Sequence, residues 1–234
     1  MADLMQISAL NYKKNNKVIL HDVNLKVEPG HFIALAGENG AGKTTLMRLI
    51  AGVAKCQQGK IAIEGSTDSN KKKSLVSYSD TLNGFGKQET IQDIAEFYNQ
   101  VYNDFSVKKF KELSKFLDVD PENKLGSLSK GMKERFMIAL TLARQVKLYL
   151  LDEPFNGIDV MSRKKIIAGL LKWVADDSTV IISSHYIAEI TDILDQIVVV
   201  KDETVVAHST AEEINKKSQG DFESYFESFY QEDK

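Results

Sequence analysis

A glycine-rich stretch at residues 37–45 is the part of the sequence best suited to chemistry. It reads GENGAGKTT and fits the pattern G-x-x-x-x-G-K-[ST], in which backbone N–H groups surround the phosphates of a nucleotide. Glycines allow the backbone conformations that this close approach requires. We expect the Lys43 ammonium to reach the terminal phosphates and the Thr44 hydroxyl to bind Mg²⁺. The candidate nucleotide-binding residues are Gly37, Glu38, Asn39, Gly40, Ala41, Gly42, Lys43, Thr44 and Thr45.

The residues on either side of this loop fit its chemistry. The apolar run at residues 31–36 is typical of a buried strand, and residues 46–52 are typical of a helix that ends at a glycine. The N-terminus of that helix would add its positive dipole end to the phosphate site. A chance match in a glycine-rich turn is the alternative, and the flanking strand and helix argue against it.

Two carboxylates follow a second apolar strand. Residues 148–151 are all apolar, and Asp152 and Glu153 come directly after them. In a phosphate-loop protein the first carboxylate holds Mg²⁺, usually through water, and the second can polarise an attacking water. An acidic turn after a strand is common in itself, but its combination with residues 37–44 favours a catalytic pair.

The rest of the pattern predicts an α/β fold around these motifs. Residues 4–27 alternate as antiparallel strands do, and residues 90–143 show helical periodicity broken at Asp120-Pro121-Glu122. We therefore expect a single domain over residues 1–234, with a mixed, mainly parallel sheet, an antiparallel N-terminal sheet and an inserted helical subdomain at about 83–145. The further expected elements are strands at 60–65, 75–78, 148–151, 179–183 and 196–201, and helices that end near 173 and 195.

Composition and the chain ends limit the class of protein. A hydrophobic content of 43% over 234 residues is enough for a core, and a net charge of -3 argues against a nucleic-acid binder driven by charge. The single cysteine, Cys56, cannot form an internal disulfide, which fits a reducing compartment. We expect no signal peptide and no membrane span, so any membrane attachment would come through another chain. Aromatic residues at helical spacing in the tail, about 210–234, indicate a helix that docks on its own domain or contacts a partner.

A further motif, LSKGM at residues 128–132, completes a set that resembles the ATP-binding subunits of ABC transporters. The family signature is usually written LSGGQ. Together with LSKGM, the other motifs stand in the family's order along the chain: GENGAGKTT at 37–45, LLDEP at 150–154, GID at 157–159 and SSH at 183–185. The resemblance covers nearly the whole chain and implies a P-loop NTPase core that uses ATP and Mg²⁺. Without the family, Ser129 and Gly131 still fit a helix start that can face an anion.

The resemblance implies roles for residues outside the phosphate loop. Tyr12 matches the aromatic residue that stacks on adenine, and a surface tyrosine near an edge strand is the alternative. Ser129 and Gly131 match signature residues that meet the nucleotide held by a second copy. Asp159 matches the loop that communicates across the two subunits.

Within the catalytic centre, the family pattern implies that Glu153 is the base and that Asp152 is the Mg²⁺ carboxylate. His185 is similar to the switch histidine that contacts the terminal phosphate. Lys43 completes this set.

The sequence departs from the family pattern in two places. No glutamine stands near residues 78–81, where the family has one, so we expect Asp80 or Thr81 to take over its contact with Mg²⁺ and water, or coupling to the membrane subunit to differ. Lys130-Gly131-Met132 replaces Gly-Gly-Gln. This variant looks like exporters of Gram-positive bacteria that handle antimicrobial or other peptides and lipids.

The function implied is an ATP-hydrolysing subunit at the cytoplasmic face of the membrane. Two such domains, in a homodimer or a heterodimer, would sandwich ATP and drive separate permease subunits, with no nucleic acid involved. One alternative is a soluble ATPase of the same superfamily that acts in translation or on DNA; the single uninterrupted cassette counts against it. The other is a degenerate regulatory module that binds ATP without turnover; the retained catalytic residues argue against it, and the missing glutamine keeps it open.

Overall fold

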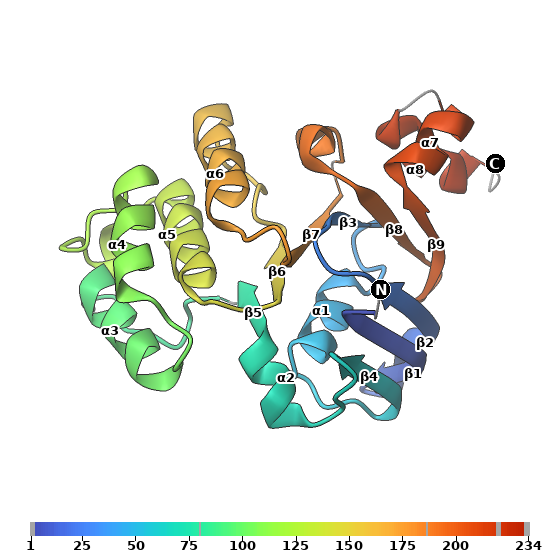
Figure 1. Cartoon of the computed structure of the whole chain (residues 1–234), viewed down its shortest axis with the longest axis horizontal. Coiled ribbons are helices and arrows are strands. Elements are labelled where there is room, and N and C mark those ends of the chain that lie inside the picture. Colours follow the sequence, from blue (N-terminus) through green and yellow to red (C-terminus); the bar gives the residue numbers. More distant parts are fainter. Residues whose placement is uncertain (1–2, 80, 186, 219–220, 232–234) are drawn as a thin grey trace.

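The computed structural model describes residues 3–79, 81–185, 187–218 and 221–231 (Figure 1). Its strands are β1 (Met5–Lys14), β2 (Lys17–Val27), β3 (Phe32–Ala36), β4 (Gln58–Ile63), β5 (Val76–Ser79), β6 (Leu148–Asp152), β7 (Thr179–Ser184), β8 (Gln196–Lys201) and β9 (Thr204–Thr210). Its α-helices are α1 (Lys43–Ile50), α2 (Ser69–Leu75), α3 (Ile91–Val101), α4 (Val107–Phe116), α5 (Lys130–Ala143), α6 (Val160–Trp173), α7 (Ala211–Ser218) and α8 (Phe222–Gln231). Three short 3-10 helices are η1 (Leu125–Ser127), η2 (Ile187–Glu189) and η3 (Thr191–Ile193).

The strands form two sheets, as the sequence predicts. The antiparallel sheet has the order β2-β1-β4, and the larger sheet has the order β5-β6-β7-β3-β8-β9. Strands β5, β6, β7, β3 and β8 are parallel, and β9 joins the edge antiparallel to β8. The α/β fold class with a mixed, mainly parallel sheet is therefore confirmed.

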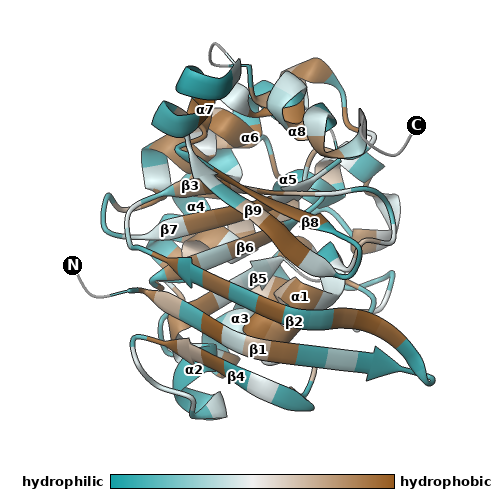
Figure 2. Cartoon of the chain, turned by 90° about the vertical axis from the view of Figure 1, so that its right-hand side faces the viewer, coloured by the Kyte–Doolittle hydropathy of each residue, from teal (hydrophilic) through white to brown (hydrophobic). Residues whose placement is uncertain are grey.

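Alternation along the strands divides the apolar residues between two cores. In β6, Leu148 and Leu150 point to a core shared with α1 and the antiparallel sheet, whereas Tyr149 and Leu151 point to the opposite core, shared with α3 to α8. Because both faces of the parallel sheet are covered, its central strands are buried along most of their length and mostly apolar. Figure 2 shows this difference: hydropathy alternates along β1 and β2, and β8 is hydrophobic along most of its length.

Helices α3, α4 and α5 come between β5 and β6 in the chain and form one side of the molecule (Figure 1). Thr90 and Asp93 form a capping box on α3, and Ser129 caps α5 as expected, by accepting from the Met132 N–H. Arg144, just after α5, is buried and donates to Asp104, to the Val76 carbonyl at the start of β5 and to the Lys73 carbonyl in α2. This arginine ties the helical layer to the sheet.

The helix expected before residue 195 is wrong. The segment contains η2 and η3 instead, and the backbone at Ile190 leaves the helical region with φ -133 and ψ 2. Asp195 explains the short turns, because its backbone and side chain both bond to Phe32 and draw the chain back to β3. Strand β9 and helix α2 were not predicted, whereas α7 lies within the helical tail expected at about 210–234.

The aromatic tail forms α8, which packs on its own chain. Phe222 and Tyr225 are buried, and α8 lies against η2, the turn that follows the His185 segment. Within the described ranges, no helix is long and apolar enough to cross a bilayer.

Candidate active site

The phosphate loop connects β3 to α1, as expected. Gly42 caps α1 with a φ of 107°, and a Cβ at this position would lie 2.9 Å from the carbonyl oxygen of Ile19. A Cβ on Gly37 would lie 2.5 Å from the carbonyl oxygen of Val200. Side chains are therefore excluded where the loop passes β2 and β8. Glu38, Asn39, Gly40 and Thr44 are exposed, so the loop is open to a ligand.

Lys43 is the buried cation of this loop. Its side chain is only 6% exposed, and Nζ donates to the carbonyl oxygens of Gly37 (2.6 Å) and Glu38 (3.1 Å). Burial lowers the pKa of Lys43, and the carboxylates of Glu153 and Asp152 oppose this shift. Nζ lies 3.6 Å from Oε1 of Glu153, so the loop and the end of β6 face each other across a charge pair.

Asp152 lies at the end of β6, and its carboxylate accepts hydrogen bonds from three hydroxyl groups. Thr44 Oγ1 and Ser183 Oγ donate to its Oδ1 at 3.1 Å and 2.6 Å, and the Tyr78 hydroxyl donates to its Oδ2 at 3.2 Å. Among the described residues, no cluster of three His, Cys, Asp or Glu side chains could hold a metal ion. One carboxylate beside one hydroxyl fits Mg²⁺ nonetheless, because this ion is usually held by one or two carboxylates together with nucleotide phosphates.

Glu153 starts a turn in a left-handed backbone conformation, with a φ of 50°. A non-glycine residue adopts this conformation at a cost, and such outliers cluster at functional sites. Its N–H donates to Ser183 Oγ at 2.8 Å, and its Oε2 lies 2.8 Å from His185 Nδ1. The carboxylate is thereby fixed beside a cavity of about 240 Å³ that Asn156 and Gly157 also line.

The remaining expected residues lie in two other places. Tyr12, in β1, is half-buried against the core under the antiparallel sheet and pairs with Leu20. Ser129 caps α5, and Asp159 caps α6. A Cβ on Gly131 would lie 3.6 Å from Ser162 Oγ and 3.9 Å from Asp159 Oδ2, so the signature and the start of α6 share one surface.

Asp80, the expected substitute for the missing glutamine, lies outside the described residues, and Thr81 is exposed. Three residues that hold the carboxylates were missed: Tyr78, Ser79 and Ser183. Ser183 belongs to the SSH motif, so the sequence did mark the segment in which this serine lies. Tyr78 ends the strand expected at 75–78 and Ser79 follows it, but only the pairing of Ser79 with Leu151 places them beside Asp152. Ser79 Oγ accepts from the Asp152 N–H at 3.0 Å.

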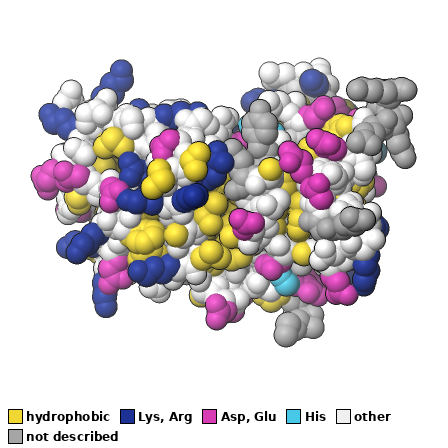
Figure 3. Space-filling model, turned by 90° about the horizontal axis from the view of Figure 1, so that it is seen from above, with side chains coloured by type: hydrophobic (Ala, Val, Ile, Leu, Met, Phe, Trp, Pro, Cys, Tyr) yellow, Lys and Arg dark blue, Asp and Glu magenta, His cyan; other side chains and the backbone are white. Residues whose placement is uncertain are grey.

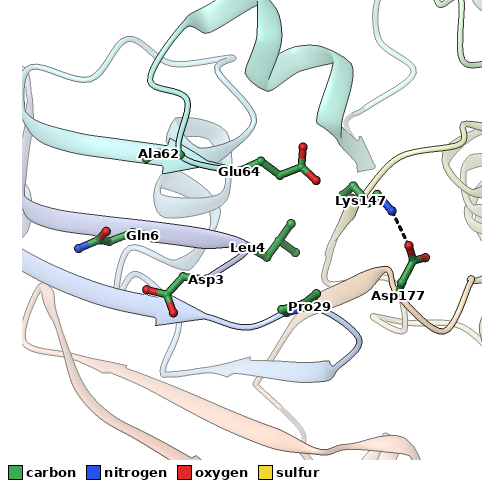
Figure 4. A pocket seen from close by; sticks show the side chains of 9 residues that line it. Asp3, Leu4, Gln6, Pro29, Ala62, Glu64, Lys147 and Asp177 are labelled. Atoms are coloured by element: carbon green, nitrogen blue, oxygen red, sulfur yellow. Dashed lines mark hydrogen bonds and ion pairs between the residues drawn. The ribbon is translucent and has the colours of Figure 1, made fainter. Parts of the chain in front are cut away.

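Other cavities lie away from this centre. One of about 650 Å³ separates the phosphate loop from the β8–β9 turn and Tyr230 of α8. Another, of about 680 Å³, lies next to Lys147 and Asp177, which come just before β6 and β7 (Figure 4). Lys147 and Asp177 form an ion pair there. Because Asp152 is at the carboxyl end of β6, this second cavity is at the opposite edge of the sheet.

Comparison with known proteins identifies the family. The family model described as "ABC transporter" matches residues 20–156, more than half of the chain. This chain belongs to the ABC transporter family. It is an ATP-binding subunit of a membrane transporter, and ABC ATP-binding domains hydrolyse ATP. Such subunits dimerise and work with separate membrane subunits.

Relatives within the ABC family differ in the direction of transport that their names state. The chain is 30% identical to the SkfA peptide export ATP-binding protein SkfE of Bacillus subtilis, over 85% of this chain and 86% of the relative. It is 32% identical to the sulfate/thiosulfate import ATP-binding protein CysA of Synechocystis, over 83% of this chain and 57% of the relative. The solved ATP-binding subunit of an ABC transporter has the same fold, with a TM-score of 0.85, 23% identity and coverage of 99% of this chain and 100% of that one.

Proposed function

We propose that two copies of this ABC domain, or one copy and a similar chain, close on two Mg-ATP molecules and that hydrolysis reopens them to drive a separate permease. The phosphate loop of one domain would hold the nucleotide, and the signature of the other would cover it. The observation that carries the proposal is that Gly131 lies beside Asp159 and Ser162, so that the N-terminus of α5, capped by the exposed Ser129, is next to the N-terminus of α6. N–H groups at helix N-termini are suited to a phosphate.

Exposed apolar side chains support an interface at this surface. Val160 and Met161, the first two residues of α6, are 58% and 68% exposed, directly after Asp159. Lys130 lies over Gly157, where an added Cβ would meet Nζ. Adjoining apolar and charged groups of this kind are typical of surfaces that a partner covers.

The distribution of charge supports pairing in a head-to-tail sense. Seen from above, Lys and Arg side chains gather on the side of the molecule that holds α4 and α5, and Asp and Glu side chains are more frequent on the side that holds α7 and α8 (Figure 3). A two-fold pairing through this face would bring the basic side of each copy over the acidic side of the other.

The chemistry assigned to the centre follows from the contacts of its side chains. Glu153 is the general base that takes a proton from the attacking water, and His185 fixes one oxygen of its carboxylate. Lys43 is held by loop carbonyls and is ready to exchange them for phosphate oxygens. Thr44 and Asp152 would hold Mg²⁺, which neutralises charge on the phosphates.

We further propose export as the direction, with peptides, antimicrobials or lipids as cargo and the cytoplasmic face of the membrane as the location. The support is the LSKGM signature, which resembles exporters of Gram-positive bacteria, and the 30% identity to a peptide export ATPase.

Purification from membranes of the native host tests the proposal. The tagged chain, extracted in detergent, should bring down a membrane-spanning protein that mass spectrometry identifies, and the complex should hydrolyse ATP. Lys43→Ala is the matched control, because it should retain the partner and lose turnover. Recovery of ribosomal proteins or DNA in place of a membrane protein would contradict the transport function.

A further inference from the structure

Tyr78 is an unassigned residue that contacts the candidate magnesium carboxylate. Its hydroxyl donates to Asp152 Oδ2 at 3.2 Å, in a partly buried position. No pattern in the sequence marked this tyrosine. It stands two residues before Asp80, in the segment where the family's glutamine is missing.

Strand register places the two side chains together. β5 and β6 are parallel, and Tyr78 pairs with Leu150, two residues before Asp152. Since side chains two residues apart on a strand share a face, Tyr78, Leu150 and Asp152 all point to the α1 side of the sheet. The tyrosine ring packs against the core on that side, and its length carries the hydroxyl along the strand to the carboxylate.

The two oxygens of Asp152 have different partners. Oδ1 accepts from both Thr44 and Ser183, whereas Oδ2 accepts from the Tyr78 hydroxyl among the residues that the structure describes. The two donors on Oδ1 already restrict rotation of the carboxylate about its terminal bond, a torsion that is otherwise broad in aspartate. A donor on the second oxygen fixes that rotation, and hence the direction in which the lone pairs of Oδ1 point.

We propose that Tyr78 is a positioning residue, whose hydroxyl orients the Asp152 carboxylate for Mg²⁺ in place of the amide side chain that the family carries after this strand. The inference rests on the proposed function, since it assumes that Asp152 and Thr44 hold the metal. In this chain the phenol of Tyr78, rather than a residue of the following loop, sets the orientation of the Asp152 carboxylate.

Tyr78 also borders a cavity that contains a second tyrosine suited to a control. The ring lines a cavity of about 340 Å³, together with Val53, Tyr98, Tyr102 and Arg144. Tyr102 shares this cavity but turns its ring to Arg144, with 4.0 Å from the guanidinium carbon to the ring centroid. Tyr102 is therefore a matched tyrosine of the same cavity that contacts Arg144 in place of Asp152.

The test measures metal binding directly. Mn²⁺ replaces Mg²⁺ as a paramagnetic probe, and its binding in the presence of a non-hydrolysable ATP analogue is followed by electron paramagnetic resonance. Tyr78→Phe should raise the Mn²⁺ concentration at half-saturation about tenfold, the lower end of the usual effect of a residue that orients a metal ligand. Tyr102→Phe should leave it unchanged. Binding of a fluorescent ATP analogue without metal should be the same in all three proteins.

Two results separate this inference from the proposed function. If the wild type binds Mn²⁺ together with nucleotide and Tyr78→Phe binds it equally well, the positioning role is wrong and the proposed function stands. If the wild type binds no metal with nucleotide, both are wrong. A double-mutant cycle guards against a general loss of structure: in the Asp152→Asn background, Tyr78→Phe should cause no further weakening, and an undiminished effect there overturns the inference.

Discussion

Nδ1 of His185 lies 2.8 Å from Oε2 of Glu153, and the other oxygen of the same carboxylate lies 3.6 Å from Nζ of Lys43. The carboxylate therefore joins the segment after β7 to the phosphate loop. The left-handed backbone at Glu153 aims the side chain into this position. A carboxylate held by two nitrogen groups is oriented in advance of the reaction, which is what a general base requires.

Replacement of the histidine tests this orientation. We expect His185→Ala to lower the rate of ATP hydrolysis about 100-fold, because the base loses a group that positions it. Nucleotide affinity should change little, since Lys43 and the loop remain. The measurement is steady-state turnover beside equilibrium binding of an ATP analogue. The matched control is His21→Ala at an exposed histidine of β2, and equal losses in both variants would contradict the role of His185.

Glu134 on α5 makes the stability of the chain depend on pH. Burial raises the pKa of Glu134 from its ordinary value of 4.5 to about 7, although nearby Lys130 opposes the shift. Between these two pH values the folded state binds more protons at this site than the unfolded state does. The contribution of Glu134 to the free energy of unfolding therefore falls as the pH rises through this window.

Glu134→Gln should remove that fall. The free energy of unfolding of the variant, relative to that of the wild type, should therefore be about 1–3 kcal/mol higher at pH 8 than at pH 5. Urea unfolding at the two pH values measures the effect. Glu112→Gln, at an exposed position of α4, should leave the pH dependence unchanged. The same pH dependence in wild type and Glu134→Gln would show that the carboxyl is not the group that titrates.

Loss of the Arg144 contacts should lower the free energy of unfolding more than loss of an exposed ion pair. It is 5% exposed and donates to both oxygens of Asp104 at 2.7 Å, to Val76 O at 2.7 Å and to Lys73 O at 2.9 Å. Arg144→Met leaves the carboxylate and two carbonyls without this donor, which should cost about 3–5 kcal/mol in urea unfolding. Lys165→Met, which breaks an exposed pair with Asp118, should cost less than about 1 kcal/mol. Similar losses in the two variants would contradict the structural role of Arg144.

The parts of the fold that could be predicted are those in which local sequence dictates local conformation. Asn15 and Asn16 both have positive φ values, 50° and 63°, and asparagine is typical of the tight turn that joins β1 to β2. The β8–β9 turn has the same geometry at Asp202 and Glu203, with φ values of 49° and 67°. Glutamate gives no signal for such a turn, so β9 was missed.

The parts of the site that could not be predicted depend on register between distant segments. The phosphate loop and the Asp152-Glu153 pair can each be recognised from a few consecutive residues. The contact of Tyr78 with Asp152 spans 74 positions and exists only because β5 lies beside β6 with Tyr78 opposite Leu150. The turns at η2 and η3 likewise follow from the bonds between Asp195 and Phe32, far away in sequence.

Closure of two domains on ATP is most directly tested with the base disabled. Glu153→Gln should bind Mg-ATP without hydrolysing it, and analytical ultracentrifugation at saturating Mg-ATP should show the mass of two chains, or of this chain and its heterodimer partner where one is supplied. Gly131→Asp in the same background is the control, because a Cβ at this position makes only ordinary contacts within its own chain, while the added charge would face the partner's nucleotide. That double variant should remain a single chain. A Glu153→Gln protein that stays a single chain with Mg-ATP bound, even beside its membrane partner, would contradict the proposal that two domains share each nucleotide.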